Sequence, residues 1–105
     1  MIYQSTSETI AGREIAETLG IARGNTIRAR HVGTDIIASL RNLVGGEVSE
    51  YTKLMGEARE QALDRMLANA RDMGADAVVT VRITTSMIAQ GAAEILAYGT
   101  AVKLK

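Results

Sequence analysis

The sequence predicts a small α+β domain with helices on one face of a mainly antiparallel sheet. Residues 13–27, 76–88 and 94–104 each divide into two alternating sets that would lie on opposite faces, which is the period of a strand. A helical period runs instead through 49–73, where apolar and charged residues fall on opposite faces. The chain has 105 residues, so we expect a single domain over 1–105.

The first long strand has one face of larger residues and one of small residues. The small face would suit a helix lying across it, and its residues are Ala16, Thr18, Gly20 and Ala22. Gly24-Asn25 is a turn signal, so residues 13–27 form either two strands or one bent strand. Before them, residues 1–6 are expected to be a brief strand or an extended arm.

Two helices are predicted between this strand and the next. Thr34 caps a short helix that Gly45-Gly46 ends, with Ile36, Ile37, Leu40, Leu43 and Val44 at helical spacing. Ser49 caps a longer helix over 49–73 that Gly74 ends. Its inner stripe is Tyr51, Met55, Ala58, Ala62, Met66 and Met73, and its outer stripe is Lys53, Glu57, Glu60, Asp64 and Arg71. A second apolar flank predicts contact with the short helix or with a neighbouring subunit, through Leu63, Leu67 and Ala70.

The last two strands should form an antiparallel pair. Ala77, Val79, Val81 and Ile83 alternate with Val78, Thr80, Arg82 and Thr84, and Gln90-Gly91 breaks the pattern before the final strand. We expect Leu19, Val79 and Val81 in the core. Glu94 precedes an apolar stretch, where we expect it to be partly buried and paired.

Composition excludes several classes of partner and chemistry. Twelve basic residues balance twelve acidic ones with no block of one sign, which argues against nucleic-acid and anionic-membrane partners. The absence of Cys excludes disulfides, Cys-ligated zinc, iron–sulfur clusters and thiol catalysis. No apolar run approaches the ~18 residues of a membrane span, and the first residues do not resemble a signal peptide, so we expect a cytoplasmic protein.

Few residues are candidates for a site. His31 is the sole histidine, and with Asp35 it could make a weak metal or acid–base site, although a polar residue in a turn is the favoured interpretation. Arg28 and Arg30 could hold an anion, although a charged edge that prevents non-specific pairing is favoured. The chain has no GxGxxG, P-loop or GxSxG motif, so we assign no catalytic residue and no cofactor.

The core must be thin. Phe and Trp are absent and only three Tyr are present, and aromatic side chains supply the largest buried areas. We therefore expect extra burial through homo-oligomerisation.

Three segments together resemble a known family. They are HVGTDIIASLRNLVGGEVSEYTKLMGEAREQALDRM, GADAVVTVRITTS and GAAEILAYGTAV. They are similar to the YbjQ-like family of small bacterial and archaeal proteins, and the resemblance runs over 5–102. It implies a dodecin-subunit-like fold, assembled as pentameric rings in which extra short strands bridge subunits. The family carries a heavy-metal-binding label and no established ligand or catalytic residues.

Three functions stay open at this stage. The first is an oligomeric binding protein that holds a small ligand or metal ion at subunit interfaces. The alternative is a structural or regulatory protein-interaction module without a small ligand. An enzyme comes last, because one His, no Cys and no cofactor motif leave only a carboxylate mechanism at a shared site.

Overall fold

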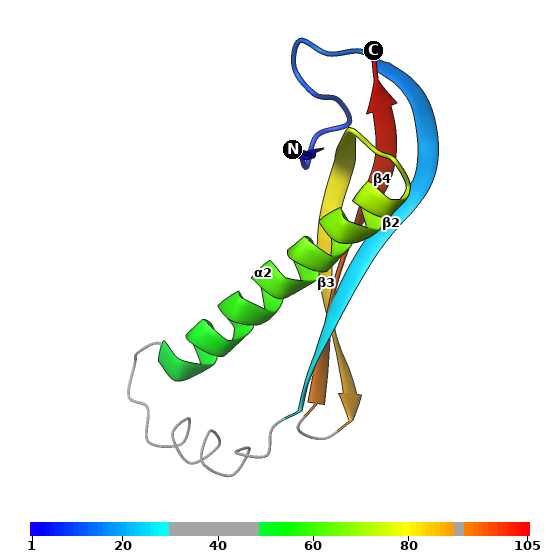
Figure 1. Cartoon of the computed structure of the whole chain (residues 1–105). Helices are drawn as coiled ribbons and strands as arrows, with labels where there is room; N and C mark the ends of the chain where they lie inside the picture. Colours follow the sequence, from blue (N-terminus) through cyan, green and yellow to red (C-terminus); the bar gives the residue numbers. More distant parts are fainter. Residues whose placement is uncertain (30–48, 90–91) are drawn as a thin grey trace.

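The computed structural model describes residues 1–29, 49–89 and 92–105. Figure 1 shows its elements, which are β1 (Tyr3–Gln4), β2 (Ile15–Ala29), α2 (Ser49–Asp72), β3 (Ala77–Ala89) and β4 (Ala92–Leu104). This arrangement confirms the α+β class. The described part of the chain holds one helix. The short helix expected after Thr34 lies outside the described residues, so the prediction of two helices is not borne out.

The strands form one mixed sheet of four in the order β1-β3-β4-β2. β4 is antiparallel to both β2 and β3, whereas the short β1 is parallel to β3. The expected antiparallel pair of the last two strands is therefore confirmed. β2 is one continuous strand. Gly24 and Asn25 pair with Ala97 and Leu96 inside it, so of the two alternatives for residues 13–27 the single strand is confirmed and two strands separated by a turn are wrong.

Gly24 serves a close contact rather than a turn. α2 crosses one face of the sheet obliquely, as Figure 1 shows, and it packs mainly on β2 and β4. A Cβ atom at Gly24 would lie 2.2 Å from the backbone nitrogen of Met66 and 2.4 Å from the carbonyl oxygen of Ala62. Only a residue without a side chain lets the helix approach β2 this closely.

The helix faces match the predicted stripes. Ala58, Ala62 and Met66 are fully buried against the sheet, and Met55 and Met73 are half-buried beside them. The predicted outer stripe is exposed at every position, namely Lys53, Glu57, Glu60, Asp64 and Arg71. The helix therefore folds against the sheet by burial of one amphipathic face.

A bulge at Thr80 divides β3 into two halves. The pairing with β4 shifts between Val79 and Arg82, and Thr80 has a φ of 54°. Val79 and Val81 are both buried, as predicted, but in different clusters: Val79 packs with Val102 and Val81 packs under α2. The expectation that they share one face is wrong, because the extra residue of a bulge shifts the alternation by one position. Leu19, also expected in the core, is half-buried at its margin.

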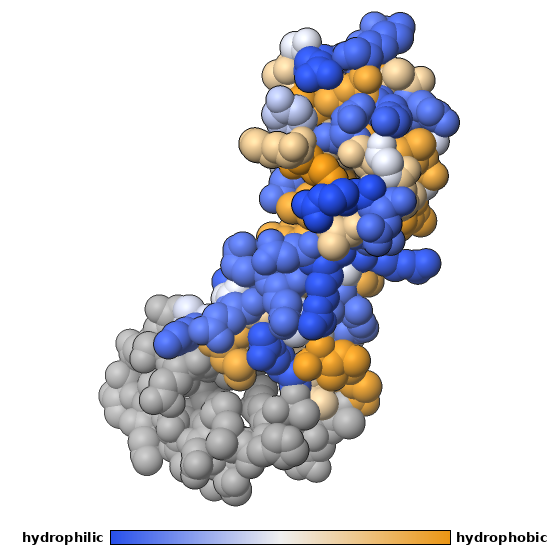
Figure 2. Space-filling model, in the orientation of Figure 1, coloured by the Kyte–Doolittle hydropathy of each residue, from blue (hydrophilic) through white to orange (hydrophobic). Residues whose placement is uncertain are grey.

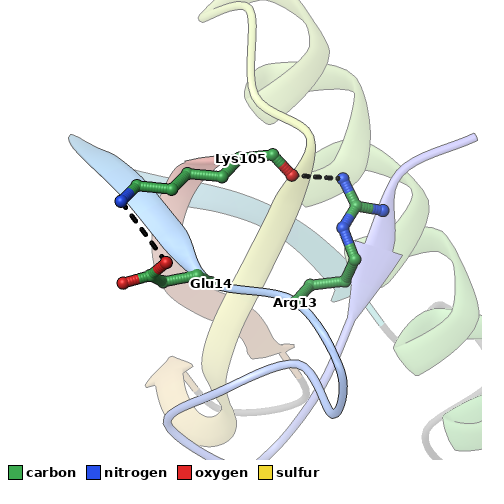
Figure 3. Close-up of polar contacts among 3 residues, drawn as sticks. All are labelled: Arg13, Glu14 and Lys105. Carbon is green, nitrogen blue, oxygen red and sulfur yellow. Dashed lines mark hydrogen bonds and ion pairs between the residues drawn. The ribbon is translucent and has the colours of Figure 1, made fainter.

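The smaller cluster lies at the far end of the sheet from the β3–β4 turn. Ile10 and Ile15 pack against it, and its buried members are Ala77, Val79, Val102 and Leu104. Figure 3 shows two contacts between the residues just before β2 and the residue after β4. Arg13 Nη2 donates to the Lys105 carbonyl oxygen at 3.1 Å, and Lys105 Nζ lies 3.3 Å from a Glu14 carboxylate oxygen. The ion pair is exposed and contributes little, so apolar packing mainly holds this end together.

Candidate interaction surface

The chain is more extended than a monomeric domain of its size. Its principal dimensions are 54 × 25 × 19 Å and its radius of gyration is 17.0 Å, whereas about 13 Å is typical of a compact domain of this length. Its accessible surface is 6846 Å², whereas size scaling gives about 5,700 Å² for a monomer of 11.2 kDa. The chain thus exposes roughly 1,100 Å² more accessible surface than a compact monomer of the same mass would.

The distal half of β3 is uncovered. Every residue from Arg82 to Ile88 is exposed, including Ile83 at 41%, Met87 at 67% and Ile88 at 53%. α2 lies over β2 and β4 instead and makes few contacts with β3. Figure 2 shows hydrophobic residues at the surface near the end of the sheet where β3 ends and β4 begins in Figure 1.

The outer edge of β3 is also open along this half. β1 pairs with β3 only at Ala77 and Val78. Ser5 and Ser7 extend the contact by accepting hydrogen bonds from the backbone nitrogens of Val81, at 3.0 Å, and Thr80, at 2.8 Å. Beyond Val81, no strand in the described part of the chain pairs with this edge. Residues 83–88 carry no charge and no Pro or Gly, which are the usual devices that protect an edge from pairing.

An apolar hollow adjoins this half-strand on the helix side. Its volume is about 260 Å³, and it is lined by Gln4, Ser5, Thr6, Leu63, Val81 and Ile83. Leu63 belongs to the second apolar flank of α2 and is half-buried here. Ile83 pairs with Ala97, and Met87 with Ala93, both of which face the helix side of the sheet. We call Leu63, Val81, Ile83 and Met87 the β3 patch.

Backbone contacts fix one rim of the hollow. Arg82 Nη1 donates to the carbonyl oxygens of Thr6, at 2.9 Å, and Val81, at 2.8 Å. Together with the Ser5 and Ser7 bonds, these contacts hold the N-terminal segment against the Thr80 bulge. A β-branched residue at positive φ is a strained backbone position. Contacts between residues far apart in the sequence therefore form this rim and hold β3 in its strained conformation at Thr80.

The other edge strand exposes two isoleucines, with the exposed Arg23 and Asn25 between them on the same face. Ile21 is 67% exposed and Ile27 is 58% exposed. They alternate along β2 with Ala22, Gly24 and Thr26, which are buried on the helix side, so both isoleucines face away from α2. We call Ile21 and Ile27 the β2 patch. The two patches therefore lie on opposite edges and opposite faces of the sheet.

Of the four candidate site residues His31, Asp35, Arg28 and Arg30, Arg28 is the one that the described part of the chain includes. It lies on β2 facing α2, its Nη2 donates to Gln61 Oε1 at 3.0 Å, and its buried Nε has no partner. It borders a polar hollow of about 530 Å³, together with Lys53, Gly56, Glu57, Glu60, Gln61 and Asp64. Arg30, His31 and Asp35 lie outside the described residues. Anion binding at Arg28 and Arg30, and metal binding at His31 and Asp35, stay predictions.

Glu94 lies as the sequence predicted. It is half-buried, and its Oε2 accepts a hydrogen bond from Asn25 Nδ2 at 3.0 Å. No three His, Asp or Glu side chains within residues 1–29, 49–89 and 92–105 form a group that could hold a metal ion.

Comparison with known proteins decides the family. A family model described as "Putative heavy-metal-binding" matches residues 1–105. The chain belongs to the YbjQ-like family. A UPF0145 protein of Methanosarcina acetivorans is 62% identical over 100 residues, which cover 95% of this chain and 94% of that protein. One from Psychromonas ingrahamii is 54% identical over 105 residues and covers 100% and 99% of the two chains.

A solved structure supports the fold of this YbjQ-like chain. It is a crystal structure of a protein of unknown function from the DUF74 family of Pediococcus pentosaceus, with a TM-score of 0.66 over 99% of this chain and 98% of that one. At 13% identity the likeness shows the fold alone. Among the described residues, no helix is both long and apolar enough to span a membrane.

Proposed function

We propose that this chain is the subunit of a homo-oligomeric binding protein, a pentameric ring that holds a small ligand or metal ion at its subunit interfaces. The observation that carries the assembly is the excess of exposed surface, with the β3 and β2 patches uncovered on one elongated chain. An excess of roughly 1,100 Å² is comparable with the ~800 Å² per partner that a standard interface buries. The family resemblance supports five copies and a dodecin-subunit-like arrangement.

The distribution of possible donors supports a ligand position at the subunit interfaces. The described residues of one chain offer no metal-binding group. The sequence contains no Cys and one His, so a metal site needs oxygen donors. Two subunits together would supply more of these ligands than one. A small apolar ligand has a place in the hollow beside Ile83, which a neighbouring subunit would close.

Light scattering on the purified protein tests the assembly. We expect a mass of about 56 kDa, five times the 11.2 kDa of one chain. A mass of 11 kDa at micromolar concentration contradicts the assembly. Native mass spectrometry of the same sample tests the ligand, since a bound molecule or ion adds a fixed mass to each ring. A ring that carries no added mass after growth in metal-supplemented medium favours the interaction module without a small ligand.

A further inference from the structure

The two uncovered apolar patches differ in place and in shape. The β3 patch is concave, since it includes the hollow beside Leu63 and Ile83, and it lies on the helix side of the sheet. The β2 patch consists of two isoleucines that project from the other face of a strand at the opposite edge. Neither patch repeats the other, so a contact between two copies of the same patch would leave the remaining one uncovered.

We infer that the β2 patch of one copy docks onto the β3 patch of the next. The inference rests on the assembly proposed above and names the surfaces that would form it. Ile21 and Ile27 of one chain would cover Ile83 and Met87 of its neighbour, so that consecutive sheets overlap at their edges. A contact between unlike surfaces is heterologous, and repeated contacts of this kind produce a ring when the rotation closes.

The area and the chemistry of the surfaces agree with this pairing. Each chain would use both patches, one against each neighbour, and would thereby cover apolar surface that a compact monomer does not expose. Residues 83–88 carry no charge, and the neighbouring Arg82 guanidinium already donates to two carbonyl oxygens. A second copy would therefore bury uncharged side chains along this half-strand. A charged ligand or a nucleic acid would find no counter-charge there.

Two substitutions test the pairing by complementation. Ile83→Lys removes the β3 patch and keeps the β2 patch, whereas Ile21→Lys does the reverse. Both positions are exposed in one chain, so each variant should fold. We expect each variant alone to have the mass of one chain by light scattering. An equimolar mixture should form a dimer of roughly twice the 11.2 kDa chain mass, because one intact contact remains and the chain of contacts cannot continue.

The outcomes separate this inference from the proposed assembly. A wild-type protein that is monomeric overturns both. A wild-type ring whose mass survives both substitutions overturns the pairing and leaves the ring standing. A variant that is dimeric by itself points to a contact between like surfaces, and two monomeric variants whose mixture stays monomeric also overturn the pairing. Ala68→Lys, at an exposed position of α2 outside both patches, is the matched control and should leave the wild-type mass unchanged.

Cross-linking supplies a second readout that does not depend on affinity. The chain has no Cys, so Ile83→Cys and Ile21→Cys each introduce a single thiol. After subunit exchange and mild oxidation, we expect disulfide-linked dimers in the mixture and none in either variant alone. Efficient linkage of Ile83→Cys to itself would overturn the unlike pairing.

Discussion

At the scale of single residues, the glycines of this chain serve different purposes. Gly24 has no room for a side chain, because an added Cβ would meet the backbone of Met66 at 2.2 Å. Gly56 lies in α2, where the nearest atom to an added Cβ is a side-chain nitrogen of Arg59 at 3.7 Å. The same substitution should therefore have opposite effects at the two positions.

We predict that Gly24→Ala lowers the free energy of unfolding by about 2–3 kcal/mol, since the strand and helix must move apart. Gly56→Ala should raise it by about 1 kcal/mol, since alanine is the better helix former and nothing obstructs it. Urea denaturation at one fixed protein concentration measures both. Equal effects of the two substitutions would contradict the close contact between β2 and α2.

Metal binding is also decided by individual residues. A closed tetrahedral site needs four donors, and the chain supplies one imidazole, no thiolate and five Met thioethers. Met66 is fully buried and Met55 and Met73 are half-buried against the sheet, where they fill the core. The remaining candidates are oxygen donors and His31.

We predict that an isolated subunit does not bind a thiophilic heavy metal tightly. Calorimetric titration of the monomeric Ile83→Lys variant with zinc and with copper(II) should show no stoichiometric site of nanomolar affinity. The result that would refute this is such a site in that variant, lost when His31→Ala is added. The wild-type protein, titrated in parallel, shows whether assembly creates a site.

At the scale of elements, β3 is held in a conformation that its sequence does not favour. Thr80 has a φ of 54°, and the N-terminal segment satisfies the backbone nitrogens of Thr80 and Val81. Glycine tolerates positive φ at no steric cost. We predict that Thr80→Gly raises the free energy of unfolding by about 1 kcal/mol. The substitution releases the backbone strain, and this gain exceeds the cost of the additional conformational entropy that glycine loses on folding.

Thr100 provides the matched control for Thr80. It lies in β4 opposite Val79, and no positive φ occurs there. Thr100→Gly should destabilise by about 1 kcal/mol, because glycine weakens a regular strand. Thermal unfolding of the two variants side by side measures the difference. If Thr80→Gly destabilises as much as Thr100→Gly, the bulge is not strained.

The elements also show what a sequence can and cannot predict. The periodicity of the sequence correctly predicted the antiparallel pair of β3 and β4 and both faces of α2. These features depend on which residues are buried along a single element. The Thr80 bulge depends on carbonyl groups of Ser5 and Ser7, more than seventy residues away in the chain, and no local pattern reports it. The role of Gly24 stayed open because a glycine marks a turn or a close contact equally well, and the helix that decides between them comes later in the sequence.

The candidate surface was predictable only in part. Leu63 and Leu67 gave a second apolar flank on the helix, and both are half-buried at the margin of the core. The contact expected of this flank, with the short helix or with a neighbouring subunit, stays a prediction. The exposure of Ile83 and Met87 depends on the path of α2 across the sheet, and that path follows from the close approach at Gly24. An alternating strand has the same pattern whether or not a helix covers it.

At the scale of the whole molecule, assembly should make stability depend on concentration. If the chain folds into a ring and unfolds to separate chains, higher protein concentration favours the ring by mass action. Each tenfold increase adds about 1.4 kcal/mol for every contact-forming association, which amounts to about 1.1 kcal/mol per chain in a pentamer. For a domain of this size, that corresponds to a rise in Tm of about 4–8 °C.

We therefore predict that the Tm of the wild-type protein rises by about 5 °C for each tenfold increase in concentration. The Ile83→Lys variant should unfold at a lower temperature that does not change with concentration, since it lacks the contact that couples folding to assembly. Differential scanning calorimetry over two decades of concentration measures both proteins. A wild-type Tm that stays constant would mean that the elongated chain is stable alone, with its apolar patches exposed to water.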